Sequence, residues 1–209
     1  MKFLAILAVC LPLTTSAQTG PRIVYTKAFP GSSPPWAGIT VERDGSTVYK
    51  ESPNDDQPLK FRLEDDETAD IFRLADKLGH FNHPLESNLK VANMGMKTFR
   101  FEDGKETHEV KFNYSLDPDA QQLADWFERI IETEQDYERL DTAVHFEKLG
   151  VNDALLLLQV SWEHKRLVAH AQFLPLLDRV AKNESYLHMA RERAASLAAA
   201  IRAGKSKPQ

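Results

Sequence analysis

The chain has 209 residues, of which 42% are hydrophobic and 27% are charged. This composition is typical of a globular protein that can bury a core, and it excludes a compositionally disordered chain. With 26 basic and 31 acidic residues the formal net charge is −5, and no run rich in Lys or Arg is present. A nucleic-acid-binding protein needs a basic stripe to neutralise phosphates, so the charge pattern disfavours that class of function.

The first residues have the pattern of a secretory signal peptide. Lys2 supplies a positive charge, an apolar run extends from Phe3 to Leu13, and small residues follow up to Ala17. The run is shorter than the roughly 20 residues that a membrane-spanning helix needs. We therefore expect a signal peptide over residues 1–17, cleaved after Ala17, and no stable membrane anchor after cleavage.

The only cysteine of the chain, Cys10, lies inside the predicted signal peptide. Residues 7–10 superficially resemble a lipidation box, but Val9 occupies the position where a small residue is usual. After cleavage the mature chain would have no cysteine, so we expect a disulfide-free protein that packing alone stabilises. The expected location is extracytoplasmic, either periplasmic or secreted.

Residues 18–38 are expected to form an N-terminal arm. Its Pro-rich part, residues 30–36, reads as a loop, and residues 22–29 before it could form an edge strand. Trp36 either caps the core or docks a partner, and the first alternative is the commoner one.

A hairpin is predicted over residues 39–50, where Asp44-Gly45 favours a two-residue turn. That turn would set Val41 opposite Val48 on one face. Leu59, Phe61 and Leu63 alternate with basic residues and predict a third strand with one buried face.

A helix is expected next, opened by the acidic residues 65–67 and stopped by Gly79. A second hairpin follows, and a two-residue turn at Asp103-Gly104 would place four apolar residues on one face: Phe99, Phe101, Val110 and Phe112. Asp117-Pro118 is typical of a helix start, and the helix could run past Leu140. Residues 39–141 thus predict an α+β domain, an antiparallel sheet with two helices packed on one face.

From residue 142 the strand signals stop, and residues 142–204 predict an α-helical extension. Gly150 is an expected break, and the helix after it contains four successive leucines, Leu155 to Leu158. Because that run is apolar on all sides, it predicts a helix buried on several faces. A short helix follows at residues 173–180, a last helix starts at Asn183, and residues 205–209 form a disordered tail.

Two resemblances go with these patterns. The order hairpin, helix, hairpin, helix from Gly45 to Glu134 resembles an uncharacterised type of exported bacterial domain, which implies no known activity. The segment from Phe173 to Ile201 resembles a HEAT-type helical pair, with Pro175 in its first helix and Ala-rich residues in its second. Arrays of such repeats are binding scaffolds, and a stable array needs about three units.

No stretch has a pattern that indicates catalytic, cofactor-binding or metal-binding residues, and no cofactor is predicted. His80 and His83 are three residues apart but lie in an expected loop, and no third ligand is near them in sequence. Asn54-Asp55-Asp56 lacks the ligand spacing of an EF-hand loop. Serine-nucleophile and phosphate-loop motifs are absent from the sequence.

The sequence therefore favours an exported, non-catalytic protein-interaction module that binds a protein partner through its C-terminal helices. One alternative is an extracytoplasmic hydrolase with a carboxylate pair assembled from distant residues. Another is a small-ligand carrier that uses the concave face of the sheet.

Overall fold

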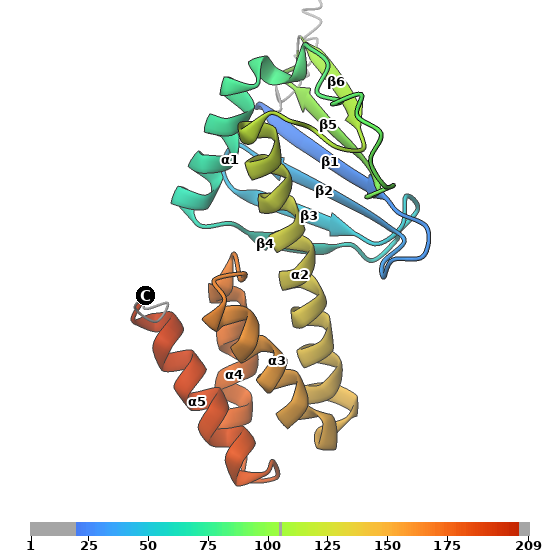
Figure 1. Cartoon of the computed structure of the whole chain (residues 1–209). Helices are drawn as coiled ribbons and strands as arrows, with labels where there is room; N and C mark the ends of the chain where they lie inside the picture. Colours follow the sequence, from blue (N-terminus) through green and yellow to red (C-terminus); the bar gives the residue numbers. More distant parts are fainter. Residues whose placement is uncertain (1–19, 105, 205–209) are drawn as a thin grey trace, which may run out of the picture.

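The computed structural model of the chain describes residues 20–104 and 106–204, so the predicted signal peptide with its cleavage site at Ala17 and the predicted tail lie outside the described residues. Six strands form one antiparallel sheet (Figure 1): β1 (Arg22–Ala28), β2 (Trp36–Glu42), β3 (Ser46–Lys50), β4 (Leu59–Arg62), β5 (Met96–Glu102) and β6 (Thr107–Phe112). The α-helices are α1 (Asp65–Lys77), α2 (Pro118–Phe146), α3 (Val151–Glu163), α4 (Leu174–Lys182) and α5 (His188–Arg202). Three short 3₁₀ helices are η1 (Gly79–Phe81), η2 (Lys148–Gly150) and η3 (His170–Phe173). The predicted α+β class is confirmed.

The first strand lies in the middle of the sheet, whose order is β4-β3-β2-β1-β5-β6. β1 pairs antiparallel with β2 on one side and with β5 on the other. The prediction of an edge strand at residues 22–29 was therefore wrong, and about half of the expected arm, residues 18–38, belongs to the sheet. Sequence alternation predicts a strand but does not say which neighbours the strand will find.

The β2–β3 hairpin has a three-residue loop, residues 43–45, in place of the predicted two-residue turn. Gly45, at a φ of 87°, donates its N–H to the carbonyl of Glu42. Val41 consequently pairs with Thr47, and Val48 pairs with Thr40. A register change of one residue turns a side chain to the other face of a sheet. Val41 is thus buried under the helices, whereas Val48 lies on the opposite face, which corrects the predicted pairing.

The β5–β6 hairpin keeps the predicted buried face. Phe99 pairs with Val110, and Lys97 pairs with Phe112. The turn lies one residue later than expected, since the N–H of Asp103 is bonded to the carbonyl of Glu106. This shift changes the pairing by two residues, which preserves the face.

Helices α1 and α2 cover one face of the sheet (Figure 1). The first core lies between them and the sheet and includes Tyr25, Phe72, Phe99 and Phe127, all of them almost fully buried. α1 starts with a capping box in which Glu64 and Glu67 bond each other's backbone N–H groups. α2 starts as predicted, because the side chain of Asp117 accepts the N–H of Asp119 at 2.8 Å.

α2 runs beyond the sheet and becomes the first helix of a second unit, formed with α3, α4 and α5 (Figure 1). We call this the helical unit. Its own core includes Leu140, Leu155, Phe173 and Leu197. The expected boundary between residues 141 and 142 therefore falls inside a continuous helix that contributes to both cores. Within the described residues, no helix is both long and apolar enough to cross a membrane.

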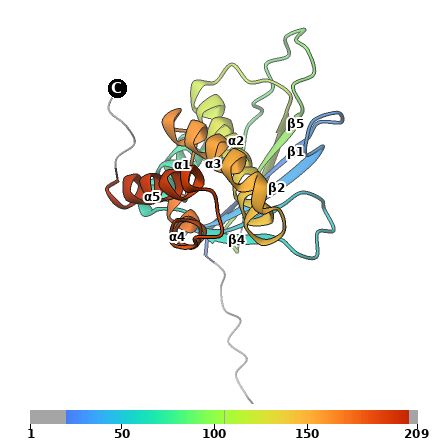
Figure 2. The ribbon, with the colours of Figure 1, turned by 90° about the horizontal axis from the view of Figure 1, so that it is seen from below.

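The other face of the sheet, which we call the open face, has no described helix packed on it (Figure 2). Uncharged residues form its centre: Val24, Thr26, Ala28, Trp36, Gly38, Thr40, Val48, Met96 and Thr98. Charged residues lie around them: Arg22, Glu42, Lys50, Lys60, Arg62, Glu102, Glu109 and Lys111. Arg100 lies among the central residues, since it pairs with Val24. Trp36 neither caps the core under the helices nor extends into solvent. Its ring lies over Gly38, where an added Cβ would come within 2.3 Å of the indole.

Candidate functional site

Helix α3 carries an exposed apolar stripe. Of the four successive leucines, Leu155 and Leu158 are buried in the helical unit, whereas Leu156 and Leu157 are each 45% exposed. Val160, one turn further, is 43% exposed. The predicted burial of this helix on several faces was therefore wrong, and three neighbouring aliphatic side chains meet solvent.

A groove runs between α3 and α5, with a volume of about 440 Å³. Its lining combines apolar with polar side chains: Gln159, Trp162, Glu163, Met189, Glu192, Arg193, Ser196, Leu197 and Ala200. Met189, at the α5 wall, is itself 55% exposed. The groove thus mixes the apolar side chains of Trp162, Met189, Leu197 and Ala200 with polar ones. The exposed stripe of α3 does not line it, and Leu157 instead lines the cleft between α2 and α3 that is described below.

Arg193 fixes the spacing of the two helices. Its guanidinium donates to the side chain of Asn152 at 2.6 Å and to that of Gln159 at 3.0 Å, so it is held against α3. Carboxylates stand on both walls of the groove, Glu163 on α3 and Glu192 on α5. The groove is therefore amphipathic, with negative charge along its rim.

No family model, curated protein or solved structure matches this chain. The two resemblances noted in the sequence accordingly stay predictions.

The segment 164–173 joins the helical unit to the sheet unit through backbone contacts with buried polar side chains. The N–H of Val168 donates to the hydroxyl of Thr133 at 3.1 Å. The N–H of Ala169, a residue at a φ of 45°, donates to the carboxylate of Glu67 at 3.0 Å. Burial raises the pKa of Glu67. The hydrogen bonds that its carboxylate accepts from the backbone N–H groups of Glu64 and Ala169 oppose this shift.

Glu134 is the most deeply buried carboxyl at this junction, with 1% of its surface exposed. Its Oε1 accepts from the side-chain amide of Gln172 at 2.9 Å, while Oε2 has no hydrogen-bond partner among the described residues. Removal from water raises the pKa of Glu134 to about 7, and the nearby carboxylate of Glu138 adds to the shift. A carboxyl with this pKa changes its charge near neutral pH.

Charged side chains on the surface reinforce the same junction. Arg166 bonds the carboxylate of Glu132 with two nitrogens, at 2.7 and 2.9 Å, and that of Asp125 with a third, at 2.7 Å. These contacts raise the pKa of the guanidinium further above its usual range. The junction between the two units is thus made by polar groups on α1, α2 and the segment 164–173.

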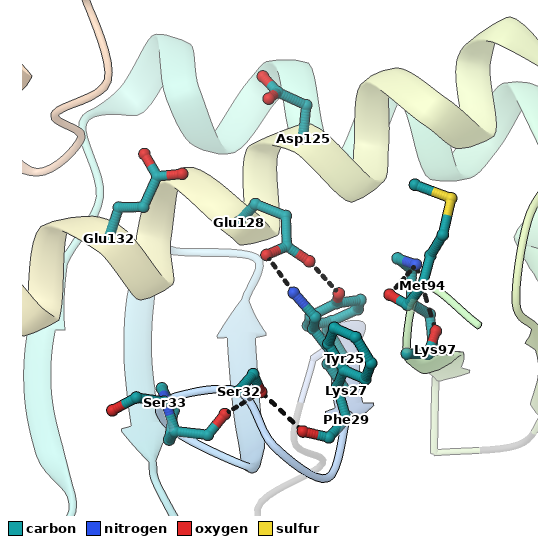
Figure 3. A network of polar contacts seen from close by, with 12 residues as sticks. Tyr25, Lys27, Phe29, Ser32, Ser33, Met94, Lys97, Asp125, Glu128 and Glu132 are labelled. Carbon is teal, nitrogen blue, oxygen red and sulfur yellow. Dashed lines mark hydrogen bonds and ion pairs between the residues drawn. The ribbon is translucent and has the colours of Figure 1, made fainter. Parts of the chain in front are cut away.

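A second polar network ties β1 to α2 (Figure 3). Glu128 points from α2 toward the sheet, where it accepts from the hydroxyl of Tyr25 at 3.0 Å and from Lys27 at 2.7 Å. Asp125 and Glu132 point away from this network. Lys97 donates to the carbonyls of Met94, Gly95 and Asn113, and burial lowers its pKa. Glu128 and Lys97 therefore have a structural role, because their bonds support the loops at this end of the sheet.

A cleft of about 560 Å³ lies between α2, α3 and the end of β3. Four carboxylates line it: Glu51, Glu138, Glu147 and Asp153. Burial and the charges of Glu51 and Asp55 raise the pKa of Glu138. The hydrolase alternative would have to use this cleft, since it gathers carboxylates from distant parts of the chain.

The histidines that the sequence analysis considered are held by structural contacts. The ring of His80 stacks on Phe101 with centroids 4.1 Å apart, and its Nε2 lies 2.8 Å from Asp76. His83 contacts the side chain of Asn82 at 3.3 Å. The side chain of Asp55 accepts hydrogen bonds from the backbone N–H groups of Glu51 and Gln57, so it stabilises the conformation of its own loop. In the described part of the chain, no group of three His, Cys, Asp or Glu residues is placed to hold a metal ion.

Sequence reasoning missed the groove and the buried carboxyl of Glu134. The stripe on α3 left a detectable signal, because four successive leucines occupy 300° of the helix and cannot all face one core. Glu134 left no signal, because its burial is created by the segment 164–173, which follows about one helix later in the chain.

Proposed function

We propose that this protein is an exported protein-binding module that docks an amphipathic helix of its partner in the groove between α3 and α5. The observation that carries the proposal is the groove itself, in which the apolar side chains of Trp162, Met189 and Leu197 lie among polar ones and Met189 is 55% exposed. An apolar surface rimmed by polar groups on a globular protein is typical of a protein-binding site.

The charges at the groove define the chemistry of the partner. Glu163 and Glu192 carry negative charge on the two walls, and Arg193 is already held by Asn152 and Gln159. A helix with apolar anchors at spacings of three and four residues and with Lys or Arg beside them complements this pattern. The occupant is therefore a basic amphipathic helix.

The predicted location is part of the proposal. The positive charge of Lys2, the apolar run up to Leu13 and the small residues before Ala17 support export and cleavage. A module without a cofactor, acting outside the cytoplasm through its C-terminal helices, fits these features.

The test uses a synthetic peptide helix with leucines at positions i, i+4, i+7 and i+11 and lysines beside them, compared with a scrambled peptide of the same composition. We expect saturable binding of the patterned peptide to the mature protein by fluorescence anisotropy. Amide NMR shifts should concentrate at α3 and α5. The substitution Met189→Glu, at the α5 wall of the groove, should weaken binding by about tenfold or more, because it places a charge against the apolar side of the peptide.

The matched control is Leu116→Glu, at a side chain that is 59% exposed in the sheet unit and far from the groove in sequence. It should leave the affinity for the peptide unchanged. Equal binding of the patterned and scrambled peptides, or an unchanged affinity in Met189→Glu, would contradict the proposal. Those results would favour the hydrolase alternative, which a screen of substrates for the cleft lined by Glu51, Glu138, Glu147 and Asp153 can test.

A further inference from the structure

Strand β6 forms one border of the sheet, and its outer side is open. Within the described residues β5 is its only neighbour in the sheet, and β6 lies at the border farthest from the helical unit (Figure 1). A hollow of about 470 Å³ lies beside the strand, lined by residues 107–111 of β6 and by residues 81–84. An edge strand with open space beside it can accept a further strand through its main chain.

The hydrogen bonds at the hairpin turn show which main-chain groups of β6 face outward. The N–H of Asp103 bonds the carbonyl of Glu106, and hydrogen-bonded pairs recur at every second residue from there. The even-numbered residues of β6 therefore direct their N–H and C=O groups toward β5. Glu109 and Lys111 direct theirs outward. Asn113, the next odd-numbered residue, fits this alternation, because its N–H bonds a carboxylate of the loop before β5.

The side chains of Glu109 and Lys111 alternate in charge along this outer border. The carboxylate and the ammonium lie 3.2 Å apart, with Lys111 63% exposed and Glu109 40% exposed. Such an exposed ion pair contributes little to stability and leaves both groups able to bind further charges. On β5, Arg100 lies opposite Glu109, but its guanidinium bonds the carboxylate of Glu102.

The alternating charges decide which strand fits beside β6. Charged side chains usually protect an edge strand, because an arriving strand seldom carries matching charges. A second copy of β6 carries them. In an antiparallel pair with a twofold axis at Val110, Glu109 of each copy lies opposite Lys111 of the other. An axis at Glu109 or at Lys111 would instead set like charges opposite each other, which is unfavourable.

The main chain is in the right phase for the same register. Glu109 and Lys111 both direct their N–H and C=O groups outward, so each of the two equivalent pairs can exchange two main-chain hydrogen bonds. On the face that the helices cover, Val110 lies beside its own copy, and His108 lies opposite Phe112 of the second copy. Val110 and Phe112 belong to the first core, so the second copy extends that core across the contact.

We propose that two copies of this chain join edge to edge through β6, antiparallel around an axis at Val110, so that one continuous sheet runs through both. The paired stretch of about five residues is about 17 Å long, which places the contact among the small interfaces of transient complexes. We therefore expect a dissociation constant of about 10–100 µM. The groove between α3 and α5 stays accessible, since it belongs to the other end of the molecule (Figure 1). The dimer is thus independent of the function proposed above.

The test exchanges the two charges of the edge. Glu109→Lys makes the edge wholly basic and Lys111→Glu makes it wholly acidic, so each variant alone should dimerise about tenfold more weakly than the wild type. Sedimentation of the mature chain between about 1 µM and 1 mM measures this. An equimolar mixture of the two variants should form a heterodimer with nearly the wild-type affinity. The double variant Glu109→Lys/Lys111→Glu restores the alternation and should dimerise like the wild type.

Hydrogen exchange locates the contact on the strand. The N–H groups of Glu109 and Lys111 face outward, whereas those of His108 and Val110 already bond β5. Raising the concentration of the wild-type chain should therefore slow exchange at positions 109 and 111 by about the ratio of monomer to dimer populations. Exchange at positions 108 and 110 should change little. An unchanged rate at positions 109 and 111 in a chain that sediments as a dimer would refute this edge.

The matched control is Lys60→Glu, the same reversal of charge on β4, the strand at the other border of the sheet. It should dimerise normally, and a weakened dimer would place the contact at β4 and refute the pairing of β6 with itself. Circular dichroism spectra and melting temperatures show whether each variant folds. A wild-type chain that stays monomeric up to 1 mM would refute the dimer. Folded single variants that dimerise normally, or a mixture that does not recover, would refute the register.

Discussion

Glu134 binds its proton more tightly in the folded protein than in the unfolded chain, because folding buries its carboxyl and leaves Oε2 without a partner. Its pKa is about 7 when folded, against an ordinary value of about 4.5. Between these two pH values the folded state keeps a proton that the unfolded state has lost. The contribution of Glu134 to the free energy of unfolding therefore falls as the pH rises from 4.5 to 7.

The substitution Glu134→Gln should remove this dependence, because an amide keeps the hydrogen-bonding shape and cannot ionise. We expect the variant to be more stable than the wild type at pH 8, by up to about 3 kcal/mol, and nearly equal to it at pH 4.5. Urea unfolding at a series of pH values measures both effects. Glu184→Gln, in an exposed loop, is the control that should follow the wild type. An identical pH profile in Glu134→Gln and the wild type would contradict the assignment.

At the scale of single elements, α3 shows what a sequence pattern can predict and what it cannot. Four successive leucines indicated a helix correctly, but they did not say which two of them face the core. That depends on where α2 and α5 lie against the helix, and these positions follow from tertiary packing. In the β2–β3 hairpin the sequence likewise predicted the two strands but not the face of each residue. The loop is one residue longer than expected, and Val48 therefore lies on the open face.

A pair of substitutions on α3 separates the two faces. Leu155 has no exposed surface, so Leu155→Ala should lower the free energy of unfolding by about 2–5 kcal/mol through lost burial and a cavity. Leu156→Ala removes an equal number of atoms from a side chain that is 45% exposed, and it should cost less than about 1 kcal/mol. Chemical denaturation of the two variants measures the difference. Equal losses would show that the exposed stripe is buried in solution.

At the scale of the whole molecule, the sequence predicted the two units but not how they share α2. This helix has 29 residues and is about 43 Å long. Phe127 lies in the core under the sheet, while Leu140 lies in the core of the helical unit. Val168 and Ala169, from beyond α3, also pack in the first core. A change of composition at residue 142 indicated the second unit. The sequence did not show that one helix belongs to both units, because α2 is continuous from Pro118 to Phe146.

Shortening the chain at the predicted boundary should therefore damage the sheet unit as well. A chain of residues 18–141 lacks Val168 and Ala169 and leaves Glu67 without the N–H that it accepts from Ala169. We expect its melting temperature to fall by about 10 °C or more relative to residues 18–209, or its cooperative transition to disappear. Calorimetry measures this, and a chain that lacks only residues 205–209 is the control. An unchanged transition in the short chain would show that the sheet unit is independent.

The central place of β1 has a consequence for how the molecule is assembled. β1 and β2 are neighbours in the sequence as well as in the sheet, but β5, the other neighbour of β1, follows only after β3, β4 and α1. Until β5 docks, a folding chain presents this edge of β1 as a row of unpaired N–H and C=O groups, which other strands can join. Because the contact between β1 and β5 is the more distant in sequence, we expect the docking of the β5–β6 hairpin to be the later step and the one that protects the chain from aggregation.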